Sequence, residues 1–268
     1  MLKYWHVFKI GIQNTLVYRV NFLFRAAFGL LPLSATLFVW RTIYEGKGSS
    51  AALGGFTLGG MVSYYLVVTM VDALTAVAED DWQIAADIKD GNISQFLLKP
   101  IDYLTYRLTL YAAGRIMFTA CALVPSGLFI LAQRSHLVLP ADAGTWALFG
   151  VSLVLTGLLQ FLIAFTMALL AFWVLEVSTF IFILYAFETL ASGHFFPIDI
   201  LPAGVVRLLY LTPFPYQMFF PVNICLGRVQ GPALLEGLAI QACWVAALYL
   251  LARFVWSRGI RRYSAVGG

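Results

Sequence analysis

The chain has 268 residues, of which 61% are hydrophobic and 11% charged, and its mean hydropathy is +0.86. This composition lies far outside the range of soluble domains, so it excludes a soluble globular enzyme and predicts a polytopic membrane protein. The net charge of +4 rests on few charged residues, so we assign the basic excess to membrane topology and exclude a nucleic-acid partner. The three cysteines lack CxxC spacing and predict neither a disulfide framework nor a metal site.

The residues before the first apolar segment, Met1–Arg19, have a helical pattern. Leu2, Trp5 and Phe8 recur at three-residue spacing, and basic residues lie around the rest of the turn. This pattern predicts an amphipathic helix on the membrane surface, with a continuous extension of the first span as the alternative. No small-residue cleavage site follows, and Arg25 interrupts the apolar run. A removable signal peptide is therefore not expected.

Six segments approach the roughly 20 apolar residues that a membrane-spanning helix needs. They are Asn21–Arg41, Phe56–Ala78, Leu108–Leu131, Trp146–Val174, Val177–Leu190 and Ala233–Trp256. The expected fold class is an all-α polytopic membrane protein with six transmembrane helices. No linker or internal repeat divides the chain, so residues 1–268 are expected to form a single transmembrane domain.

The distribution of Lys and Arg predicts the orientation, because cytoplasmic loops carry an excess of these residues. With six spans, both termini lie on one side. That side holds Lys3, Lys9, Arg19, Lys89, Lys99, Arg107, Arg253, Arg258, Arg261 and Arg262. The other side holds Arg41, Lys47, Arg134, Arg207 and Arg228. We therefore expect a multi-pass protein of the plasma (inner) membrane with both termini in the cytoplasm.

The polar stretch "DIKDGNISQFLLKPIDY", Asp87–Tyr103, lies between the second and third spans and is the only long loop expected on the cytoplasmic side. Asp81 is expected to cap a short helix, Trp82–Asp90. Gly91 can end that helix in a left-handed conformation. The stretch therefore predicts a folded loop.

A second short helix is expected to start at Asn92 or Ser94 and to close before Pro100. It carries an apolar tip formed by Phe96, Leu97 and Leu98. An apolar tip on a cytoplasmic loop is costly in water unless it lies on the membrane or fits a partner. A protein partner is therefore a hypothesis, and a loop lying on the lipid headgroups is its rival.

The fifth span is short and is followed by an apolar but irregular segment, "SGHFFPIDILPAGVVRLLYLTPFPYQMFFP", Ser192–Pro221. Five prolines interrupt it, and non-helical backbone at membrane depth must be buried in protein or face water. This predicts an extracellular re-entrant hairpin between the fifth and sixth spans. Its aromatic residues are expected to form either a gate over a translocation path or an anchor at the membrane interface. The candidate gate residues are Phe195, Phe196, Phe214 and Tyr216.

Charged residues inside spans are candidate functional groups, because ionisable side chains are costly in the membrane. Asp72 is expected to pair with Arg115 or Arg25, and a direct role in transport is the alternative. Snorkelling to the headgroups is a further explanation of the two arginines. Glu188 meets either a cationic substrate or an arginine of the hairpin. His194 is expected to be structural, since no HxxxH or HExxH spacing accompanies it.

The order of these features resembles the type-2 ABC exporter permeases over nearly the whole chain. Gly91, the short helix with Leu97 and Leu98, and Pro100 are similar to the coupling loop of that family. "SGHFFPIDILP" with "LTPFPYQMFFP" resembles its extracellular re-entrant segment. The coupling residues that this resemblance implies are Asp87, Lys89, Asp90, Gly91, Phe96, Leu97, Leu98 and Pro100. In the family a Glu/Arg-rich run is frequent where this chain has its three charged residues.

The resemblance implies an ATP-driven exporter in which two permease chains, as a homodimer or a heterodimer, pair with two cytoplasmic ATPase subunits. The only Gly-Lys pair, Gly46-Lys47, lacks the other residues of a phosphate loop, so no ATPase motif is present in the chain. ATP and Mg are therefore expected on the partner subunit, and no cofactor or metal on this chain. Membrane lipids are the remaining expected partner.

Few interior charges and abundant Phe and Tyr favour an amphiphile, a hydrophobic drug or a lipid-linked molecule as substrate. An ion-coupled secondary transporter is an alternative, although only one half of the chain has a broken helix. An intramembrane enzyme is a less favoured alternative, because the sequence offers no nucleophile or metal set at membrane depth.

Overall fold

The computed structural model describes residues 2–47, 52–77, 80–140 and 142–263. These ranges are helical apart from turns and loops, and contain no β-strand beyond one isolated bridge between Leu53 and Phe56. Within these ranges, five helices are long and apolar enough to cross a membrane. They are α2 (Arg19–Lys47), α3 (Leu58–Thr75), α6 (Tyr103–Ala132), α7 (Ala143–Ala168) with its extension η2 (Leu169–Phe172), and α11 (Gly231–Arg262). The all-α fold class is confirmed.

The fifth predicted span is shorter than the others. It forms α8 (Ser178–Ala191), whose 14 residues extend about 21 Å at 1.5 Å per residue, against a hydrocarbon core of about 30 Å. The helix ends because Gly193 takes a positive φ of 85°, a conformation that favours glycine. Helices long and apolar enough to span a membrane are thus found for five of the six predicted segments. Ala78, at the end of the second predicted segment, lies outside the described residues.

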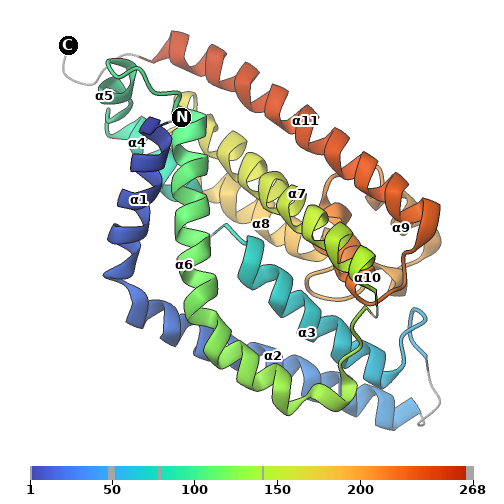
Figure 1. Ribbon diagram of the computed structural model, residues 1–268. Coiled ribbons are helices and arrows are strands. Elements are labelled where there is room, and N and C mark those ends of the chain that lie inside the picture. The colour runs from blue at the N-terminus through green and yellow to red at the C-terminus, as the bar shows by residue number, and fades with distance from the viewer. Residues whose placement is uncertain (1, 48–51, 78–79, 141, 264–268) are drawn as a thin grey trace.

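The two ends of the molecule carry different elements (Figure 1). α1 (Leu2–Leu16) begins, and α11 ends, beside the short helices α4 (Asp80–Lys89) and α5 (Ile93–Leu97). We call this the loop end. The opposite end, the hairpin end, carries the segment after α8 with η3 (Ile198–Ile200), α9 (Ala203–Leu209), η4 (Phe214–Tyr216) and α10 (Phe219–Cys225).

The N-terminal segment forms a helix of its own. α1 ends at Leu16, and α2 starts at Arg19 in a different direction after a turn (Figure 1). A continuous extension of the first span is therefore wrong. The location of α1 on a membrane surface stays a prediction.

Two buried clusters hold the helices together. The larger cluster surrounds α3, whose side chains from Met61 to Val68 are all buried. The smaller cluster lies toward the loop end and joins Ile84 of α4 to Phe165 of α7 and Ala252 of α11. α3 and α7 are therefore the central helices, and the loop helices are part of the packed structure.

The long helix α11 touches both ends of the fold through two glycines. A Cβ at Gly259 would overlap the ring of Phe172 in η2, and a Cβ at Gly237 would overlap the ring of Phe220 in α10. Between them, the fully buried Gln241 donates from Nε2 to the main-chain oxygen of Tyr216 at 2.8 Å. α11 thus packs closely on the hairpin and on the loop region at once.

Candidate functional site

The cytoplasmic loop of the prediction forms two short helices, α4 and α5, joined by Gly91. The φ of Gly91 is +79°, which confirms the left-handed turn. The prediction that Asp81 is the N-cap of the first helix is wrong, because α4 already begins at Asp80 and Asp81 lies in its first turn. There Oδ1 of Asp81 accepts a hydrogen bond from the backbone N–H of Trp82.

One face of this loop is buried. Ile84 and Ile88 of α4 and Ile93 of α5 are almost fully buried, in the cluster that includes α7 and η2. The sequence analysis missed this docking face, although the four-residue spacing of Ile84 and Ile88 on a helix could have indicated it. The loop is therefore fixed to the membrane helices by apolar packing.

The three apolar residues of the predicted tip do not point the same way. The ring of Phe96 packs on Tyr103, with the ring centroids 5.0 Å apart, and on Tyr106, at 4.9 Å. Leu97 is 53% exposed and Leu98 is 88% exposed. The exposed tip of the loop thus consists of the two leucines, and Phe96 anchors it from beneath.

The charged residues of the loop also differ. Lys89 and Asp90 are exposed. Asp87 faces α6, where its Oδ2 accepts a hydrogen bond of 2.7 Å from the Tyr103 hydroxyl and lies 3.8 Å from Nη1 of Arg107. The Asp87 carboxylate therefore ties the loop to a spanning helix, and its role in coupling stays a prediction.

Segments distant in sequence hold the rest of the loop. The Ser94 hydroxyl lies 3.0 Å from the hydroxyl of Tyr263, just beyond α11. Lys3 of α1 donates to the carbonyl of Pro100, which is itself exposed. Arg253 of α11 binds the Asp102 carboxylate. α1, α6, α7 and α11 thus all contact one loop.

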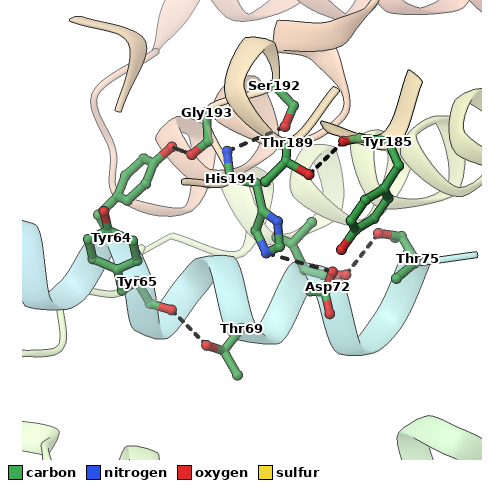
Figure 2. A network of polar contacts seen from close by, with 12 residues as sticks. Tyr64, Tyr65, Thr69, Asp72, Thr75, Tyr185, Thr189, Ser192, Gly193 and His194 are labelled. Atoms are coloured by element: carbon green, nitrogen blue, oxygen red, sulfur yellow. Dashed lines mark hydrogen bonds and ion pairs between the residues drawn. The ribbon is translucent and has the colours of Figure 1, made fainter. Parts of the chain in front are cut away.

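Two backbone carbonyl groups of the hairpin after α8 accept hydrogen bonds from tyrosine side chains of α3 (Figure 2). The hydroxyl of Tyr64 donates to the carbonyl of Gly193, and that of Tyr65 donates to the carbonyl of Phe195 at 2.7 Å. Buried carbonyl groups need such donors. The carbonyl groups of Gly193 and Phe195 are thus satisfied by protein, and the sequence analysis missed the two tyrosines that bind them.

Asp72 faces the hairpin. Its Oδ1 lies 4.0 Å from Nε2 of His194 (Figure 2). Arg115 of α6 lies on the same helix end, where it donates hydrogen bonds of 2.6 to 2.8 Å to the main-chain carbonyls of Asp72, Ala73 and Ala76. Arginine thus satisfies the last carbonyl groups of α3, and the Asp72 carboxylate also lies close to the hairpin histidine.

Two cavities flank the Asp72–His194 pair. The first, of about 430 Å³, is lined by residues of α3, α7, α8 and the hairpin and includes Glu188. The second, of about 420 Å³, is lined mainly by α2, α3 and α6 and includes Phe195. Arg25 and Asp72 line both cavities. The structure thus places Arg25, Asp72 and Glu188 around one polar region between the spans, whereas Arg115 lines neither cavity.

The aromatic residues named as a candidate gate fall into separate contacts. Phe195 and Phe196 pack on each other, with the ring centroids 6.1 Å apart. Phe214 packs on Phe187 of α8 at 5.3 Å. Tyr216 is buried and packs on Phe220. They do not form one continuous aromatic surface.

A comparison with protein-family models matches residues 30–267 to the family described as ABC-2 family transporter protein. The chain belongs to the ABC-2 transporter family. It is a membrane permease of that family, a transport subunit and not a catalytic one. The resemblance drawn from the sequence is thereby confirmed. No curated protein and no solved structure matched this permease.

Proposed function

We propose that this ABC-2 permease is the membrane subunit of an ATP-driven exporter. In this proposal it forms half of a translocation path with a second permease chain, the same or a related one. Two copies of a cytoplasmic ATPase subunit supply the energy, and ATP and Mg are bound there. The exported molecule is an amphiphilic or hydrophobic compound, a drug or a lipid-linked molecule.

The observation that carries the proposal is the loop α4–α5. Four elements hold it rigidly, so a force on the loop is passed to spans on both sides of the cavities. Its outermost residues are nevertheless apolar, with Leu98 88% exposed. A rigid loop with an apolar tip suits a groove on a cytoplasmic subunit, where central apolar anchors supply most of the binding energy.

The proposed orientation places the loop end in the cytoplasm and the hairpin end outside the plasma membrane. The excess of Lys and Arg on the loop end supports it. α8 together with the hairpin then serves as the sixth membrane segment, since the helix alone is too short to span. The hairpin closes the outer end of the path.

A second permease chain is proposed to cover α8. This helix leaves six large apolar or aromatic side chains exposed: Phe180, Phe182, Ile183, Tyr185, Phe187 and Leu190. Apolar exposure alone fits lipid equally well. However, the same helix carries Glu188 and Thr189 at the lining of the first cavity, and polar groups are costly against hydrocarbon. A protein partner accommodates both kinds of residue.

Co-purification with the ATPase subunit tests the proposal. We expect the double variant Leu97→Ser, Leu98→Ser to lose association with a tagged ATPase subunit. The matched control is Leu175→Ser, because Leu175 is 90% exposed in the connection between α7 and α8. Undiminished association of the double variant, or equal loss in the control, would overturn the coupling role of the loop.

A further inference from the structure

Two residues that line the first cavity each carry a buried polar atom without a hydrogen-bond partner in the described part of the chain. Gln217 of the hairpin is 1% exposed, and its Nε2 is buried without a hydrogen-bond partner among the described residues. Oε1 of Gln160 on α7 is likewise buried, and no described residue forms a hydrogen bond with it. A buried polar atom without a partner costs about 1–3 kcal/mol. One unpaired donor and one unpaired acceptor at a single cavity therefore indicate a site for a polar ligand.

The charge of the lining favours a cation. The carboxylates of Asp72, Asp81 and Glu188 line the cavity, against the guanidinium of Arg25 and the imidazole of His194. Asp72 already faces His194 at 4.0 Å. Glu188 faces the amide of Gln217, but the two groups do not close a hydrogen bond within the described part of the chain.

Apolar side chains form a further part of the lining. They include Ile181 and Phe182 of α8, Met167 of α7 and Met218 of the hairpin. Such a wall suits a hydrocarbon or aromatic body, while the polar groups fix its orientation. A metal ion is a poor fit, because the described residues hold no group of three His, Cys, Asp or Glu side chains that could bind one.

We propose that this cavity binds an amphiphilic organic cation that carries both an N–H group and an oxygen acceptor. The ammonium group donates to the Glu188 carboxylate and to Oε1 of Gln160. The ligand oxygen accepts from Nε2 of Gln217, and the apolar body lies against the α8 side of the cavity. This inference rests on the proposed function, since it names the chemical class of the exported molecule.

Equilibrium binding to the full chain in lipid nanodiscs tests it without an ATPase subunit. Three probes share an octyl chain: N-octylethanolamine, its N,N-dimethyl quaternary analogue, and the neutral amide N-octanoylethanolamine. Uptake by empty nanodiscs is subtracted for each. We expect the ammonium probe to bind at least about tenfold more tightly than either analogue, the ratio that one charge-assisted hydrogen bond supplies.

Two variants locate the binding. Glu188→Gln is expected to bring the ammonium probe and the neutral probe to similar affinity, and Gln217→Leu to weaken the ammonium probe. The control is Glu176→Gln, since Glu176 is exposed and does not line the cavity. It is expected to bind as the wild type does.

Equal affinity of the three probes for the wild type would overturn the inference, even if a variant failed to fold. An unchanged preference in folded Glu188→Gln would overturn it as well. Either result, combined with intact association of the ATPase subunit, would leave the proposed function standing. Specific binding of the ammonium probe by a permease that does not associate with the ATPase subunit would support the inference and overturn the proposed function.

Discussion

Phe96 and Leu98 are close neighbours in the loop but differ in packing and exposure. Phe96 packs on two tyrosines of α6, whereas Leu98 is 88% exposed. Phe96→Ala should therefore lower the free energy of unfolding by about 2–3 kcal/mol, because a partly buried ring is removed from a packed site. Leu98→Ala should change it by less than about 0.5 kcal/mol.

Thermal unfolding of the two variants in detergent, followed by tryptophan fluorescence, checks this prediction. An equally large loss of stability in Leu98→Ala would show that Leu98 also packs on the chain. That result would remove the argument that the leucine is held outward for a partner.

At the junction of the loop and α6, Asp102 is an acid with a lowered pKa. Burial raises the pKa of this carboxyl, but hydrogen bonds from Thr105 and Arg253 lower it by more, so the folded pKa lies below the usual value. Its stabilising effect is then present above the unfolded pKa of about 3.9 and is lost as the pH falls through the lower folded value.

Comparison of the wild type with Asp102→Asn tests this pH dependence. The difference in unfolding temperature between the two should be largest near about pH 7 and should shrink as the pH approaches about 3. A difference that stays constant over this range would show that the carboxylate charge contributes nothing to the junction.

At the scale of elements, α11 depends on close approach at its two glycines. Gly259→Ala should destabilise the chain by about 1–3 kcal/mol, because its Cβ would overlap the Phe172 ring. Gly150→Ala in α7 is the matched control. No atom lies within 4 Å of the added Cβ there, so its stability should stay equal or rise, as helix propensity predicts.

The unfolding temperatures of the two alanine variants test whether the close packing of α11 on η2 stabilises the chain. If Gly259→Ala and Gly150→Ala behave alike, the close packing of α11 on η2 is not required for stability.

The elements show how far sequence reasoning extends. The long apolar runs predict α2, α3, α6, α7 and α11, because length and hydropathy alone decide a span. The same rule overestimates α8, since the run ends in a glycine turn whose carbonyls are bound by tyrosines of α3. The two short loop helices follow from Gly91 and Pro100.

The candidate site is less accessible to sequence reasoning. Asp72, Glu188 and Arg25 are recognisable because charges in spans are rare, and the structure places them around the cavities. Their partners are not recognisable. His194 meets Asp72 across more than 100 residues of chain, and Ser94 meets Tyr263 at a separation of 169 residues. Such contacts arise from the packing of helices and leave no local pattern.

At the scale of the whole molecule, the ends should face opposite sides of the membrane. On a cysteine-free background, Lys99→Cys reports on the loop end and Gly204→Cys on the hairpin end. A membrane-impermeant thiol reagent should label Gly204→Cys in intact cells and Lys99→Cys only after the cells are opened. Labelling of both from outside would contradict the orientation deduced from the basic residues.

Stimulated ATP hydrolysis tests the central claim, that the loop α4–α5 couples this permease to an ATPase, most directly. The wild-type permease and the double variant Leu97→Ser, Leu98→Ser are each reconstituted with the ATPase subunit in nanodiscs, and hydrolysis is compared with that of the ATPase alone. The account predicts stimulation by the wild type and none by the folded variant. Equal stimulation by both would contradict it.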